Sequence, residues 1–161
     1  MQFTRQRVIA FVFAVGITVT ATGLLAAVNF HNVSCTSDPN TFAVSCTGII
    51  SGLGNGTYDL FVTATGVATT TCTNKGGNEA PGQNPANVTS AGVVPITINS
   101  DTNGNYDFTV NGAPPPQPTA RQAGCPGNNW TATIVSVDYS TATLTVKLGN
   151  RTVASGTFPV Q

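Results

Sequence analysis

The sequence has 161 residues, and only 7% of them are charged, against roughly 25% in an ordinary soluble domain. Six Lys or Arg residues balance six Asp or Glu residues, so the formal net charge is zero. No basic cluster is available to neutralise phosphates, which argues against nucleic acid as a partner. Thr, Ser, Asn and Gly must therefore solvate the surface.

Residues 1–27 have the order of a secretory signal peptide. Arg5 and Arg7 form a basic start, and residues 8–25 follow as an apolar stretch without a charge. The stretch is about long enough to span a bilayer, but Thr and Gly residues dilute its far end and no basic flank follows it. We expect a signal helix that is removed, and a protein that is secreted or held at the cell surface without a stable membrane span.

Small residues close the leader and offer more than one cleavage point. Cleavage after Ala27 leaves residues 28–161 as one domain that begins with an apolar strand. Ala21 and Gly23 are the alternative ends of the leader, because small residues also stand there.

The chain after the leader alternates between short apolar strands and turn residues, and no stretch repeats its apolar residues at helical spacing. The clearest strand is 141–148, in which Leu144 and Val146 should be buried while Thr143 and Thr145 face solvent. The expected strands are 30–34, 42–50, 57–74, 93–99, 105–110, 130–139, 141–148 and 152–160.

Two of these segments carry finer expectations. Residues 57–74 are too long for one flat strand and contain Gly66, so we expect two strands or a bulged one, with Tyr58, Leu60 and Val62 inward at its start. Residues 130–139 should place Val135, Val137 and Tyr139 on one face.

Turn chemistry predicts two hairpins. Residues 100–104 contain an Asn-Gly step between strands 93–99 and 105–110, and Gly149-Asn150 separates strands 141–148 and 152–160. Pro159 places the last strand at an edge of its sheet. The total of seven to nine strands predicts an all-β fold, an antiparallel β-sandwich of immunoglobulin-like kind.

The four cysteines are an even number in an exported chain, which predicts two disulfides rather than a metal site. Three pairings are possible. We favour a local clip between Cys35 and Cys46 and a long-range bridge between Cys72 and Cys125. Close C-x-x-C pairs, which a four-thiolate zinc site needs, are absent.

Two stretches rich in Gly, Pro and Asn, 75–87 and 111–129, should be loops, and the second contains a proline run that must be extended. Each ends near a cysteine of the long-range bridge, which should hold both loops at one end of the sandwich. We expect a binding surface there, and its candidate residues are Asn78, Glu79, Gln83, Asn128, Asn129 and Trp130.

Three segments together resemble a known group of proteins. The run CTNKGGNEAPGQN at 72–84, the later GCPG at 124–127 and the strand TIVSVDYS at 133–140 are similar to small secreted β-sandwich proteins of uncharacterised function from actinobacteria and their relatives. The resemblance covers 57–146. It implies an exported single β domain and transfers no catalytic residues, and Cys35 and Cys46 lie outside it.

Catalytic and metal-binding patterns are weak. His31 is the only histidine, and no serine sits in a G-x-S-x-G elbow. The oxygen-rich run 101–107 lacks the spacing and the bidentate Glu of a calcium loop. Four acids could in principle form a glycosidase pair, but solvated surface positions explain them equally; they are Asp59, Glu79, Asp107 and Asp138.

These observations predict a non-enzymatic, extracellular structural or interaction domain without a cofactor or metal. Its partner would be a cell-wall or matrix polysaccharide or another copy of the chain. The alternative is a polysaccharide-binding module in which Trp130 stacks on sugar, although a lone Trp at the start of a strand is more often part of the core. A hydrolase is the third interpretation.

Overall fold

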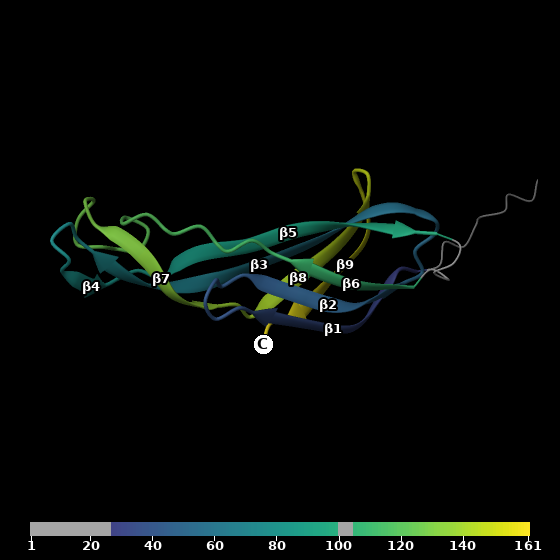
Figure 1. Ribbon diagram of the computed structural model, residues 1–161, viewed down its shortest axis with the longest axis horizontal. Coiled ribbons are helices and arrows are strands. Elements are labelled where there is room, and N and C mark those ends of the chain that lie inside the picture. Colours follow the sequence, from purple (N-terminus) through teal and green to yellow (C-terminus); the bar gives the residue numbers. More distant parts are fainter. Residues whose placement is uncertain (1–26, 100–104) are drawn as a thin grey trace, which may run out of the picture.

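The computed structural model describes residues 27–99 and 105–161, and every regular element in that part of the chain is a β-strand (Figure 1). The strands form two antiparallel sheets, which confirms the predicted all-β sandwich. The leader, residues 1–26, lies outside the described residues. The nine strands are β1 (Asn29–Ser37), β2 (Val44–Ser51), β3 (Gly56–Thr73), β4 (Glu79–Pro81), β5 (Ala86–Ile98), β6 (Tyr106–Asn111), β7 (Thr131–Asp138), β8 (Thr141–Leu148) and β9 (Arg151–Pro159).

The small sheet has the order β1-β2-β6. Cys35 and Cys46 are direct partners in the β1–β2 ladder and form the predicted local disulfide. The register of this ladder shifts between His31 and Ser34, so β1 contains a bulge. Alternate residues of β2 point into the core, and the others form the outer face of the small sheet.

The large sheet is built around β3, an uninterrupted strand of 18 residues. The expectation of two strands is wrong, because β3 alternates buried and exposed side chains along its whole length, and Tyr58, Leu60 and Val62 point inward as predicted. β5 and then β4 pair with one side of β3, while β8 and then β7 pair with the other. Gly66 keeps β3 continuous, since a Cβ there would lie 2.6 Å from the Asp138 carbonyl oxygen.

The inward face of 130–139 differs from the prediction. Ala132 and Ile134 are buried, whereas Val135 is 56% exposed. The pairing with β3 passes from Ile134 directly to Ser136, so Val135 is the extra residue of a β-bulge. The bulge reverses the alternation and returns Tyr139 to the core, where it is 5% exposed.

The predicted hairpin of 93–99 and 105–110 is wrong. β5 pairs with β3 in the large sheet, and β6 pairs with β2 in the small sheet. The physical reason is burial, because both strands have strongly apolar inward faces that pack against each other across the interior rather than side by side. The turn 100–104 itself lies outside the described residues. The second predicted hairpin is confirmed, since β8 pairs with β9, and β9 forms a sheet edge.

The small sheet covers only the part of the large sheet that lies away from β4 and β7 (Figure 1). The main core fills the space between the sheets, and Leu60, Ile96 and Leu144 are fully buried in it. Two small clusters continue the core toward the β4–β7 end, one around Ile134 and one around Cys72.

At the β4–β7 end, which the small sheet does not cover, an extended segment packs on the large sheet. The chain after β6 runs back along the large sheet toward β4 and β7 (Figure 1). Its buried residues are Gly112, Pro115 and Pro118, a spacing of three that fits a polyproline II helix, which has three residues per turn. Gln117 Oε1 accepts a hydrogen bond of 2.7 Å from Ile134 N and ties this strap to β7.

Candidate functional site

The two predicted loops meet at the β4–β7 end of the molecule. Cys72 and Cys125 form the second predicted disulfide, which spans 53 residues, and the Asn84 N–H donates to the Ala123 carbonyl at 3.1 Å. The first loop is not entirely irregular as expected, because residues 79–81 form β4 against the end of β3. We call this surface, formed by 74–85 and 119–130, the loop end.

Five of the six candidate residues are exposed at the loop end: Asn78, Glu79, Gln83, Asn128 and Asn129. The sixth, Trp130, is half-buried and packs beside the Cys72–Cys125 disulfide.

The candidate residues do not all share one face. Glu79 is opposite Thr73, and Thr73 is opposite Thr131, so these three residues form one row across the outer face of the large sheet. Trp130 instead contacts the cluster around Cys72, which is on the inner face. The loop end therefore offers a polar edge with the indole beneath it, rather than a cleft with the indole at its centre.

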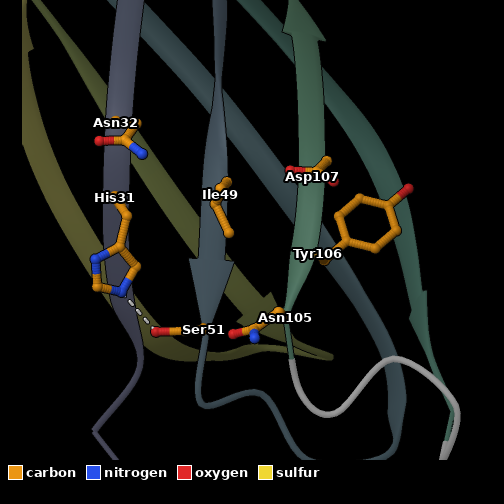
Figure 2. A pocket seen from close by; sticks show the side chains of 7 residues that line it. All are labelled: His31, Asn32, Ile49, Ser51, Asn105, Tyr106 and Asp107. Atoms are coloured by element: carbon orange, nitrogen blue, oxygen red, sulfur yellow. Dashed lines mark hydrogen bonds between the residues drawn. The ribbon is translucent and has the colours of Figure 1, made fainter.

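A second surface, which the sequence did not indicate, is a shallow pocket on the outer face of the small sheet (Figure 2). It has a volume of about 480 Å³, and we call it the sheet pocket. The lining residues come from all three strands and are His31, Asn32, Ile49, Ser51, Asn105, Tyr106 and Asp107.

Strand register places the central residues of the sheet pocket. His31 is opposite Ile49, and Ile49 is opposite Asp107, so one row crosses β1, β2 and β6. Two strand spacings separate His31 from Asp107, roughly 9 to 10 Å between Cα atoms. Ile49 forms the apolar floor between them. Tyr106 packs against the core and turns its hydroxyl away from the other lining residues (Figure 2).

His31 and Ser51 form a hydrogen-bonded pair, with 2.7 Å between Nε2 and Oγ (Figure 2). A serine nucleophile needs such a base, but the base must itself be oriented by a third group. Asp107 does not reach the imidazole, because Ile49 and its whole strand lie between them. The pair thus has the serine–histidine contact of a catalytic triad, but Asp107 does not supply the histidine–carboxylate contact.

The four acids considered for a glycosidase pair do not gather. Asp107 is on the small sheet, and the other three belong to the large sheet. Asp59 lies eight residues along β3 from Val67, the partner of Asp138, so roughly 26 Å separate these two acids along the strand. Glu79 is farther along the same direction, opposite Thr73.

Two side chains elsewhere have shifted pKa values. Hydrogen bonds from the backbone N–H groups of Thr41 and Asn40 lower the pKa of Asp38, whose carboxylate caps the turn between β1 and β2. Burial raises the pKa of Tyr139, whose hydroxyl donates to the Phe42 carbonyl at 3.1 Å. Both groups fix the same turn.

Protein-family models, curated proteins and solved structures contain no match to this chain. The resemblance to small secreted actinobacterial proteins therefore stays a prediction. Among residues 27–99 and 105–161, no three His, Cys, Asp or Glu residues are grouped to hold a metal, and no helix is long and apolar enough to cross a membrane.

Proposed function

We propose that this protein is an extracellular, non-enzymatic structural and interaction domain, and that the loop end is one of its contact surfaces. The observation that carries the proposal is the Cys72–Cys125 bridge. It fixes two Gly-, Pro- and Asn-rich loops, which would otherwise be free to move, into one surface of exposed amides. Ordering such loops costs conformational entropy. Because the bridge orders them before any contact forms, they present a defined surface to a partner.

Two features support an extracellular location. Disulfides persist in oxidising compartments, and the described chain has two of them and no free cysteine. The leader pattern at 1–27 is that of exported proteins. We also retain the proposals that this leader is cleaved, that the sandwich is of immunoglobulin-like kind, and that the chain belongs with the secreted proteins it resembles.

The hydrolase interpretation receives less support. The His31–Ser51 pair has the nucleophile and the base, but the nearest carboxylate on its row is two strands away. A base without an orienting partner is a poor proton acceptor for serine. A hydrogen-bonding role for these residues needs no such partner.

Retention at the cell envelope tests the proposal. The secreted protein should sediment with the envelope of the cells that produce it. Because the proposed role is non-enzymatic, it should release no soluble fragments from the envelope. Replacing the loop-end amides (Asn78→Ala, Asn128→Ala and Asn129→Ala together) should reduce retention. A matched triple variant at other exposed amides, Asn40→Ala, Asn55→Ala and Asn150→Ala, should not. Equal retention of both variants would remove the loop end from the proposal, and absence of wild-type retention would remove the interaction role.

A polysaccharide-binding module at the loop end is the second candidate. The observation in its favour is Trp130, which is half-buried rather than fully enclosed and lies beside exposed Asn128 and Asn129. If its ring stacks on sugar, soluble envelope glycan should change the tryptophan fluorescence, and Trp130→Ala should abolish binding without lowering the melting temperature. If the indole serves mainly to cover the disulfide, glycan should have no effect and the same variant should lose roughly 3 to 5 kcal/mol of stability.

A further inference from the structure

The sheet pocket combines an apolar floor with a polar rim of two amides, a histidine, a serine and one carboxylate. Ile49 is half-buried at its centre, and His31, Asn32, Asn105 and Asp107 surround it on exposed positions. The lining is therefore mostly polar around one apolar contact, so hydrogen bonds rather than apolar area would set what it binds.

The backbone at Asn32 is the strongest sign that the sheet pocket is a built feature. Asn32 has a φ of 50°, a left-handed conformation that is uncommon outside glycine and that Asn adopts more readily than most other residues. It lies within the β1 bulge, between His31 and Ser34. Bulges re-aim side chains near functional sites. Here the bulge sets Asn32 on the pocket rim directly above His31, as Figure 2 shows.

The only other non-glycine residue with positive φ in the described chain has a structural explanation. Phe42 closes the turn between β1 and β2, donates its N–H to the Asp38 carbonyl at 2.8 Å and accepts from the Tyr139 hydroxyl. The side chain of Asn32 has no comparable task in the fold, since glycine would satisfy the same backbone.

The chemistry of the rim selects the ligand class. No Lys or Arg lines the pocket, so it has no cation for a phosphate or sulfate group. Its single carboxylate is too few for calcium, which takes six to eight oxygen ligands. The amides of Asn32 and Asn105 donate and accept hydrogen bonds, and Asp107 accepts them, which matches the paired hydroxyls of a sugar.

We propose that the sheet pocket binds one saccharide unit of a neutral polysaccharide. The carbon–hydrogen face of the sugar ring lies on Ile49, and its hydroxyls bond Asp107 at one side and Asn32 and the His31–Ser51 pair at the other. Because the pocket is shallow and open on a sheet face, a longer chain can cross it without a free end. This inference rests on the proposed function as an extracellular interaction domain, and it places the saccharide contact on the small sheet.

Nuclear magnetic resonance titration of the secreted, disulfide-bonded protein tests the proposal. The probes are cellohexaose, chitohexaose and mannohexaose, with hexagalacturonate as the anionic comparison. At least one neutral hexasaccharide should give saturable shifts of the Asn32, Ile49 and Asp107 amides. Asn32→Gly and Asp107→Asn should each weaken binding by roughly tenfold, about the value of one hydrogen bond to a charged or well-oriented group.

Matched controls separate binding from folding. Asn32→Gly suits the positive φ, so it should keep the melting temperature while binding weakens. Asp59→Asn removes a carboxylate from the large sheet instead and should leave the affinity unchanged. Shifts confined to the loop end, shifts with hexagalacturonate alone, or full affinity in both pocket variants would overturn the inference. Because retention is assigned to the loop end, these binding results can overturn the inference while leaving the proposed function intact.

Discussion

At the scale of single residues, two buried hydroxyls differ in their hydrogen bonding. Ser90 Oγ accepts from Val44 N at 3.0 Å and donates to the Ala113 carbonyl at 2.9 Å, so it joins β2, β5 and the strap. Thr70 Oγ1 is buried without a hydrogen-bond partner. A satisfied buried hydroxyl stabilises the fold, and an unsatisfied one costs the desolvation of that group.

Substitution of these hydroxyls should therefore act in opposite directions. Thr70→Val keeps the shape and removes the unpaired group, so the free energy of unfolding should rise by roughly 1 kcal/mol, whereas Ser90→Ala leaves two backbone groups unpaired and should lower it by roughly 1 to 3 kcal/mol. Urea denaturation measures both. Destabilisation by Thr70→Val would mean that the hydroxyl has a bonding partner.

The lowered pKa of Asp38 predicts a pH dependence. Its folded pKa lies below the unfolded value, so its contribution is present at neutral pH and is lost as the pH falls through the folded pKa. Asp38→Asn should melt at a lower temperature than the wild type at pH 7, and the difference should shrink as the pH falls through the folded pKa of Asp38. Melting curves across this range check the sign; a difference that persists in acid would assign the effect to the amide itself.

At the scale of elements, β8 shows how far period-two patterning reaches. Leu144 and Val146 are fully buried, as the alternation predicts, and Thr143 and Thr145 are half-exposed. Leu144→Ala should cost roughly 2 to 5 kcal/mol through lost burial and a cavity, against about half a kcal/mol or less for Thr143→Ser. Similar losses for the two variants in chemical denaturation would contradict the register.

Replacing Gly66 in β3 or Gly54 just before it by Ala should change the stability by different amounts. A Cβ at Gly66 would lie 2.7 Å from the Tyr139 ring and 2.8 Å from Val137, where β7 passes into β8. Gly66→Ala should therefore cost roughly 1 to 3 kcal/mol through overpacking. Gly54→Ala, whose nearest neighbour would be 3.8 Å away, should change the stability by about half a kcal/mol or less. Thermal melts distinguish them, and equal effects would show that the strands can separate at Gly66.

Local sequence predicted strands well and predicted their partners poorly. The alternation in β8 and the Gly-Asn turn before β9 depend on neighbouring residues, which the sequence displays directly. The assignment of β5 and β6 to different sheets depends on which apolar faces meet across the core. The bulge at Val135 is a feature of the pairing between β7 and β3, and no local signal in the sequence marks the bulge or the assignment of β5 and β6.

The same limit explains the sites. The loop end could be predicted because each of its two loops adjoins a cysteine of the expected Cys72–Cys125 bridge. The sheet pocket could not, because it exists only through the register that aligns His31, Ile49 and Asp107 from three separate strands. The positive φ of Asn32 could not be predicted either, because the pairing of β1 with β2 sets the backbone conformation at the bulge.

At the scale of the whole molecule, most of the sheet edges are unsuited to pairing with another chain. Pro81, Pro95 and Pro159 lie in three of the four outer strands of the large sheet, and each lacks a backbone donor, while β7, the fourth, contains the bulge at Val135. The ladders of β1 and β9 also contain register shifts that disturb a flat edge. Contacts with a partner are therefore better made by the loop end and the outer sheet faces.

The molecule also has two unequal halves, which predicts local unfolding. The main core lies between two sheets, whereas the β4–β7 end is covered only by the proline strap and small clusters around Ile134 and Cys72. Replacing both Cys72 and Cys125 by Ala should cost roughly 2 to 4 kcal/mol, mainly through entropy of the unfolded chain. Hydrogen exchange should then show faster opening of β4 and β7 while β2 and β8 stay protected.

The paired variant Cys35→Ala with Cys46→Ala supplies the comparison. Its bridge spans 11 residues instead of 53, so the chain-entropy contribution should be about 1.4 kcal/mol smaller, and the loop end should keep its protection. If loss of the Cys72–Cys125 bridge instead raised exchange uniformly in both sheets, the two halves would unfold as one unit. The loop end would then derive its order from the main core, and the bridge would no longer account for its fixed surface.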